Sequence, residues 1–124
     1  MSRWIVDGMN VIGSRPNGWW RDRPGAMRAL VQELEAFAER GGEAVTVVFD
    51  GRPFDLDSGS VDVMFASRRG PNAADDDIAV LVQGDDEPSE LSVVTSDGDL
   101  AGRVRAAGAA VVGAGEFRRR LDEG

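Results

Sequence analysis

Short apolar runs rich in β-branched residues recur along the chain and predict strands. They cover residues 3–6, 44–49, 61–67, 91–95 and 110–112. The run at 44–49, AVTVVF, is almost wholly apolar, which is typical of a strand buried on both faces of a sheet. The pattern therefore predicts a sheet with a covered centre.

The segments between these runs follow helical periodicity. An apolar stripe over residues 27–38 predicts a helix that begins near Pro24 and ends at the glycine pair 41–42. A shorter helix is expected to begin near Ala73 or Ala74, another covers 100–107, and the C-terminal tail EFRRRLDEG, residues 116–124, forms a surface helix.

Strands and helices in this order predict an α/β fold, a three-layer α/β/α sandwich around a mostly parallel central sheet. Right-handed crossovers are expected. Residues 1–124 are the right length for a single domain. In sheets of this kind ligands bind in the crevice beyond the carboxyl ends of the strands.

Composition removes many kinds of chemistry. The chain has no Cys, no His and no Lys, and its net charge is −8. These absences exclude disulfides, thiolate or imidazole metal sites, a Ser-His-Asp triad, a Schiff base and a Walker A phosphate loop. Carboxylates, amides, hydroxyls and Arg remain, and such a set usually works with a hard divalent cation.

No apolar run approaches the roughly 20 residues needed to span a bilayer, and no signal-peptide pattern opens the chain. We therefore expect no membrane partner and a cytoplasmic location.

Aspartates gather where the predicted strands end. Asp7, Asp50 and Asp97 each follow a strand, and Asp99 lies two residues beyond the last of them. In a parallel sheet these positions share one edge. Asn10 follows Asp7 closely and would orient water or phosphate there without adding charge.

Three further acids open the helix near residue 74, at the same edge. Asp75 shares a helical row with Ile78 and Val82, so it is expected to reach inward. Asp77 also flanks the buried stripe, whereas Asp76 lies nearly opposite it. The side chain of Asp75 is the first choice for the site.

Like charges so close together repel unless a cation lies among them. An all-oxygen set without imidazole favours Mg²⁺ or Mn²⁺ and fits zinc poorly. The candidate catalytic residues are Asp7, Asn10, Asp75 and Asp97. The candidate metal ligands are Asp7, Asp50, Asp75, Asp76, Asp97 and Asp99.

Each acidic motif also has a structural interpretation. Asp-Gly pairs mark turns, acids in a first helical turn meet the helix dipole, and the sequence SDGDL could simply cap the helix that follows. Their convergence on one sheet edge favours the metal site.

Four segments, VDGMNVIG, VVFDG, NAADDDI and VVTSDGDL, together resemble the NYN domain, particularly its YacP-like branch within the PIN-like nuclease superfamily. The similarity extends over nearly the whole chain, to GAAVVGAGEF near its end. It implies a PIN-like, Rossmann-like fold and a Mg²⁺- or Mn²⁺-dependent endoribonuclease that leaves 5′-phosphate and 3′-hydroxyl ends.

The resemblance implies an acidic pocket with Asp50 beside it. The pocket residues it indicates are Asp7, Asn10, Asp75, Asp97 and Asp99. Two positions depart from the family pattern: Met9 stands where Tyr is more frequent, and Ala74 where some relatives carry an acid. Asp76 is acidic, as in YacP-like members, and its part in the metal's outer shell stays open.

Arginines and tryptophans suited to RNA flank these motifs, since bases stack on indole and Arg binds phosphate. The candidate RNA-binding residues are Arg15, Trp19, Trp20, Arg21, Arg52, Arg68 and Arg69, with Arg23 close by. Alternatively, one Trp packs under the helix and the other is incidental surface.

Other functions remain as alternatives. One is a catalytically silent RNA- or ribosome-binding module of the same fold. Another is a phosphatase or phosphoacceptor domain, but such sites typically enlist a lysine. A dinucleotide-binding domain is excluded because no G-x-G-x-x-G follows the first strand. We expect RNA as partner, such as messenger or ribosome-associated RNA, and a monomer or homodimer.

Overall fold

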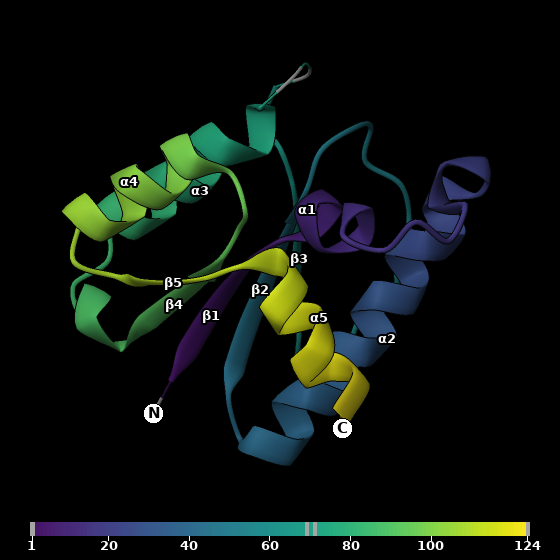
Figure 1. The fold of residues 1–124 in the computed structure, drawn as a ribbon, viewed down its shortest axis with the longest axis horizontal. Coiled ribbons are helices and arrows are strands. Elements are labelled where there is room, and N and C mark those ends of the chain that lie inside the picture. Colours follow the sequence, from purple (N-terminus) through teal and green to yellow (C-terminus); the bar gives the residue numbers. More distant parts are fainter. Residues whose placement is uncertain (1, 69, 71, 124) are drawn as a thin grey trace.

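A five-stranded parallel sheet forms the centre of the computed structural model, which describes residues 2–68, 70 and 72–123 (Figure 1). The strand order is β3-β2-β1-β4-β5. The strands are β1 Arg3–Asp7, β2 Ala44–Phe49, β3 Asp62–Phe65, β4 Leu91–Val94 and β5 Ala110–Val112. Every recorded pairing is parallel, so the sheet is parallel throughout rather than mostly so.

Helices cover both faces of this sheet and make the predicted three layers (Figure 1). On one face lie α1 Gly8–Gly13, α2 Arg23–Gly41 and α5 Ala114–Glu123. On the other lie α3 Ala73–Gln83 and α4 Gly98–Ala106. Short 3₁₀ turns, η1 Trp19–Arg21 and η2 Pro88–Glu90, precede α2 and β4.

Each face of the sheet has its own apolar core. Under α2 and α5, the rings of Trp4, Phe37 and Phe117 pack with centroids 5.2–5.4 Å apart. Under α3 and α4, Ile78 and Leu100 pack on the other face of β1, β2 and β4 and are almost completely buried. The stripe at 27–38 is buried as its spacing predicts.

The central strand β1 pairs with β2 on one side and with β4 on the other. The chain builds outward from β1 through β2 and β3, then crosses back through α3 to β4 on the opposite side. The reversal creates a switch point at the carboxyl ends of β1 and β4, where such folds bind ligands.

The helix α1 is absent from the sequence-based prediction. Asp7-Gly8 resembles a turn, yet the chain passes directly from strand to helix, and Gly8 does not have a positive φ. A Cβ at Gly8 would lie 2.4 Å from Cε1 of Phe49. Glycine is therefore required by close packing on β2, whereas Gly51, with φ of 104°, is a true turn glycine.

The other predicted elements agree with the structure to within a few residues at their ends. None of the helices in the described ranges is both long enough and apolar enough to cross a bilayer.

Candidate functional site

Asp7 is the most buried acid of the candidate site, with only 3% of its surface exposed. It lies at the end of β1 and caps α1, since its Oδ1 accepts a hydrogen bond from the backbone N–H of Asn10 at 3.4 Å. The hydroxyl of Thr95 donates to its Oδ2 at 3.5 Å. Burial, with the nearby charges of Asp75 and Asp50, raises the pKa of Asp7 to about 7.

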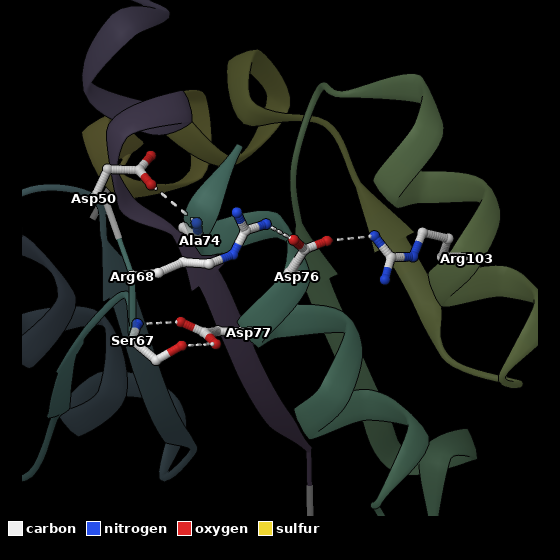
Figure 2. Close-up of polar contacts among 7 residues, drawn as sticks. All are labelled: Asp50, Ser67, Arg68, Ala74, Asp76, Asp77 and Arg103. Carbon is white, nitrogen blue, oxygen red and sulfur yellow. Dashed lines mark hydrogen bonds and ion pairs between the residues drawn. The ribbon is translucent and has the colours of Figure 1, made fainter. Parts of the chain in front are cut away.

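Asp50 and Asp97 fix the starts of the two helices on the other face. The Oδ1 of Asp50 accepts a hydrogen bond from the backbone N–H of Ala74 at 2.9 Å, in the first turn of α3 (Figure 2). The Oδ1 of Asp97 accepts from the N–H of Leu100 at 2.9 Å and caps α4. Within the described ranges, the second oxygen of each carboxylate has no hydrogen-bond partner.

Asp75 completes the group from the first turn of α3. Its pKa is raised by partial burial and by the charges of Asp97, Asp50 and Asp99, while the guanidinium of Arg103 acts in the opposite direction. We call Asp7, Asp50, Asp75, Asp97 and Asp99 the acidic group. The negative charges of these acids raise the pKa of Asp7 and of Asp75, so the fold brings them close together although they are spread from residue 7 to residue 99.

Asn10 joins α1 to the loop after β4. Its Oδ1 accepts a hydrogen bond from the backbone N–H of Ser96 at 2.7 Å, which fixes the orientation of the amide. The hydroxyl of Ser96 in turn accepts from the N–H of Ala114 at 2.9 Å. Asn10 and Ser96 also line an uncharged recess of about 330 Å³ with Met9 and Ser14.

The acidic group fits a divalent cation in its chemistry. Carboxylate and amide oxygens are the ligands preferred by Mg²⁺ and Mn²⁺, and the switch point places them where ligands bind in this fold. In the part of the chain that the structure describes, no three acidic side chains are already arranged as a coordination shell. The residues that could hold the cation are Asp7, Asp75, Asp97 and Asp99, with Asp50 beside them.

Asp76 and Asp77 lie on other sides of α3 and make other contacts (Figure 2). Asp76 forms ion pairs with Arg68 and with Arg103. The carboxylate of Asp77 accepts hydrogen bonds from the backbone N–H and the hydroxyl of Ser67. The carboxylate of Asp76 is already paired with two guanidinium groups, and its assignment as a metal ligand stays a prediction.

The candidate RNA-binding arginines occupy different surfaces. Arg68 lies beside α3, and the exposed Arg52 lies on the loop that follows β2. Arg23 donates to the backbone carbonyl oxygen of Asp50 at 3.4 Å. Arg15 instead pairs with Asp122 of α5, away from the acidic group. Arg69 lies outside the described residues.

The two adjacent tryptophans differ in burial. Trp19 packs against the core beside α2, whereas 58% of Trp20 is exposed. Their rings meet edge to face with centroids 5.9 Å apart. Arg21 is exposed in the same turn. Trp20 is thus the one of the pair available for stacking on a base.

The sequence pattern does not single out Thr95, Ser96 or Arg103. Thr95 is buried, donates to Asp7, and accepts from the N–H of Asp97 at 3.1 Å, so it links two acids of the group. Its only sequence signal is its position just before SDGDL. Arg103 has none, because its role depends on the packing of α4 against α3.

Comparison with known families identifies the class. The chain belongs to the YacP-like NYN domain family, which matches residues 4–124, and it has the nuclease-like fold of that family. Among solved structures it is similar to Rae1 (YacP) from Bacillus subtilis, with a TM-score of 0.81 and 26% identity over 99% of this chain and 75% of that one. A mutant of Rae1 gives a TM-score of 0.84 and 27% identity over 99% and 76%. A search of curated proteins gave no match.

Proposed function

We propose that this protein is a Mg²⁺- or Mn²⁺-dependent endoribonuclease that hydrolyses RNA phosphodiester bonds to 5′-phosphate and 3′-hydroxyl ends. The observation that supports it most is the acidic group: a buried Asp7 with a pKa of about 7, kept close to further carboxylates at the switch point of a nuclease-like fold. A fold that only needed helix caps would not need a buried carboxylate surrounded by others.

Asp7, Asp75, Asp97 and Asp99 would hold the cation, with Asp50 beside them. When bound, such a cation activates water as a nucleophile and stabilises charge on the phosphodiester. The side chains have distinct tasks. Asp7 and Asp97 have their orientations fixed by capping bonds to α1 and α4, so they do not have to be ordered when substrate binds.

Asn10 contributes a neutral polar group beside the acids. Because its carbonyl oxygen is held by Ser96, its amide is set in one orientation at the edge of the uncharged recess. We assign to it the positioning of water or of the scissile phosphate. The exposed Trp20 and the arginines near the site would bind neighbouring nucleotides.

The test is cleavage of a mixed pool of single-stranded and structured RNA with Mn²⁺, with Mg²⁺ and with EDTA. We expect cleavage with either metal and none with EDTA. Asp7→Asn and Asp97→Asn should each lower the rate at least 100-fold, while both keep an oxygen that can accept the capping hydrogen bond.

Asp86→Asn is the matched control. It makes the same change of charge in an exposed loop before β4, at the opposite edge of the sheet. Cleavage that persists in EDTA, or that survives Asp7→Asn, would contradict the proposal. RNA binding without cleavage under any metal would favour the silent binding module.

A further inference from the structure

Three consecutive aspartates at the start of α3 point in three directions. Asp75 lies close to the other carboxylates of the acidic group. Asp76 forms ion pairs with two arginines, and Asp77 accepts hydrogen bonds from Ser67 (Figure 2). Of these three acids, Asp76 alone forms ion pairs within the described residues, so its surroundings differ from those of its neighbours.

Asp76 joins two guanidinium groups from separate elements. Arg68 belongs to the segment between β3 and α3, and Arg103 lies in the last turn of α4. In Figure 2 the two arginines approach the carboxylate of Asp76 from opposite sides, each binding one of its oxygens. The distance from Nη1 of Arg103 to Oδ1 of Asp76 is 3.1 Å.

Both guanidinium groups keep donors for a ligand. Each binds Asp76 through a single nitrogen, and a guanidinium carries five N–H donors. In the described ranges Asp76 is the only ion-pair partner of either arginine. Their side chains are 59% and 38% exposed, so the remaining donors can be reached from solvent.

The pair lies directly beside the acidic group. Asp75 precedes Asp76 in α3, and the charge of Arg103 acts on Asp75 against the surrounding acids. An RNA strand that approaches the acidic group meets strong repulsion, because its phosphates carry the same charge as the carboxylates. Two arginines at the edge of the group supply the opposite charge, in a geometry that matches phosphate.

We propose that Arg68 and Arg103 form a phosphate-binding pair for the RNA backbone, and that Asp76 is the positioning residue that holds them in place. The inference rests on the proposed function for its ligand. It assigns Asp76 to substrate binding instead of metal binding, and it adds Arg103 to the substrate-binding residues.

Affinity for a fluorescein-labelled single-stranded RNA, measured by anisotropy against NaCl concentration, tests the pair. The measurement uses full-length Asp97→Asn protein with Mg²⁺, which prevents cleavage. Arg68→Gln and Arg103→Gln should each weaken binding about 5- to 10-fold and make the slope of log K against log [salt] shallower by about 0.7. Arg103→Lys should keep the slope.

Arg105→Gln is the matched control, because it removes the same charge from an exposed position two residues further along α4. Binding by this variant should equal that of the parent protein. If Arg105→Gln weakens binding as much as Arg103→Gln, the effect is a general one of net charge and the pair is overturned.

Asp76→Asn distinguishes positioning from simple electrostatics. Loss of a negative charge beside RNA would tighten binding if only charge mattered, whereas loss of positioning weakens it. We expect about 3- to 10-fold weaker binding, recovery in Asp76→Glu and unchanged affinity for Mn²⁺. Tighter binding, or a lower Mn²⁺ affinity, would overturn the assignment.

Failure of the pair and failure of the proposed nuclease are separable. If the unmodified protein cleaves RNA, and the Arg68 and Arg103 variants bind and cleave it equally well, the phosphate-binding pair is overturned and the nuclease is not. Binding that depends on the pair in a protein that cleaves nothing supports the pair and removes the nuclease. A parent protein that binds no RNA overturns the pair.

Discussion

Asp7 caps α1, and in the proposed enzyme it would also bind a cation; these two roles make opposite demands on its environment. Capping α1 requires it to lie at the junction of β1 and the helix, where it is buried. Binding a cation requires it to be ionised, which burial disfavours. Burial and the neighbouring charges raise the pKa of Asp7. A bound cation would lower this pKa again, because it favours the ionised form.

Stability in metal-free buffer should depend on pH through Asp7. Its pKa rises on folding from 3.8 to about 7, so the folded chain keeps a proton that the unfolded chain releases in this range. The free energy of unfolding therefore falls as pH rises from about 4 to about 7 and levels off above, by up to about 4 kcal/mol.

Asp7→Asn removes this titration while keeping an oxygen acceptor for the cap. We expect it to stabilise the protein at pH 8 in EDTA by up to about 4 kcal/mol, the full penalty of ionising the buried carboxyl. At pH 5 the difference should be much smaller. Thermal unfolding at the two pH values measures both effects. Equal melting temperatures of the two proteins at pH 8 would contradict the shifted pKa.

At the level of elements, α1 depends on close packing of its first residue. A Cβ at Gly8 would lie 2.4 Å from the ring of Phe49 and 3.0 Å from Val47. We expect Gly8→Ala to lower the free energy of unfolding by about 1–3 kcal/mol through overpacking. Chemical denaturation measures this loss.

Gly13 provides the control for that substitution. It ends the same helix, and a Cβ there has no atom within 4 Å. Gly13→Ala should therefore leave stability unchanged or raise it by up to about 1 kcal/mol, since alanine loses less backbone entropy. Equal losses in both variants would show that the helix tolerates no side chain at either position.

The side chain of Glu35 in α2 binds the end of the loop before β3. Burial alone would raise the pKa of Glu35, but hydrogen bonds from the backbone N–H groups of Gly59, Val61 and Ser60 and from the Ser60 hydroxyl hold that pKa below its usual range. These bonds order residues 59–61, the segment that leads into β3.

Glu35→Ala should speed hydrogen exchange at the amides of Gly59, Ser60 and Val61 about 10-fold or more, because their acceptor is removed. Mass spectrometry of peptides covering residues 55–63 measures the effect. Glu39→Ala, an exposed acid one turn along α2, should leave those peptides unchanged. Unchanged exchange in Glu35→Ala would show that the loop is held by other contacts.

Elements with a long apolar period or a β-branched run were predictable from the sequence. The stripe at 27–38 and the run at 44–49 are examples. The helix α1 was not predictable, because its six residues include two glycines and are too few to show helical periodicity of apolar positions. Its capping pair Asp7-Gly8 also resembles a turn. The signal that could have found it is an acid at the cap position followed by Val11 and Ile12.

The candidate site was predictable only in part. Parallel strands that each end in Asp bring acids to one edge, and helical geometry separates Asp75 from Asp76. The partners of Asp76 were not predictable, because Arg103 reaches it through the packing of α4 on α3, and Arg68 through the conformation of the irregular segment before α3. The buried Thr95 could not be found for the same reason.

At the scale of the molecule, the net charge of −8 would restrict how the proposed RNA substrate binds. General attraction to phosphate would be weak, so affinity for RNA would come from the few arginines near the acidic group. We expect log K for single-stranded RNA to fall with log [salt] with a slope of about −2 to −3, as for three or four phosphate contacts. A much steeper slope would show that a larger basic surface is used.

Mn²⁺ titration followed by NMR tests the central claim that the acidic group holds a divalent cation. Paramagnetic broadening should appear first at the amides of Asn10, Ala74 and Leu100, which donate to Asp7, Asp50 and Asp97. The loop at 85–90, before β4, carries four acids, serves as an internal control and should broaden last. Asp7→Asn should require more Mn²⁺ for the same effect. Broadening that begins at the 85–90 loop, or that spreads evenly over the chain, would contradict a metal site in the acidic group.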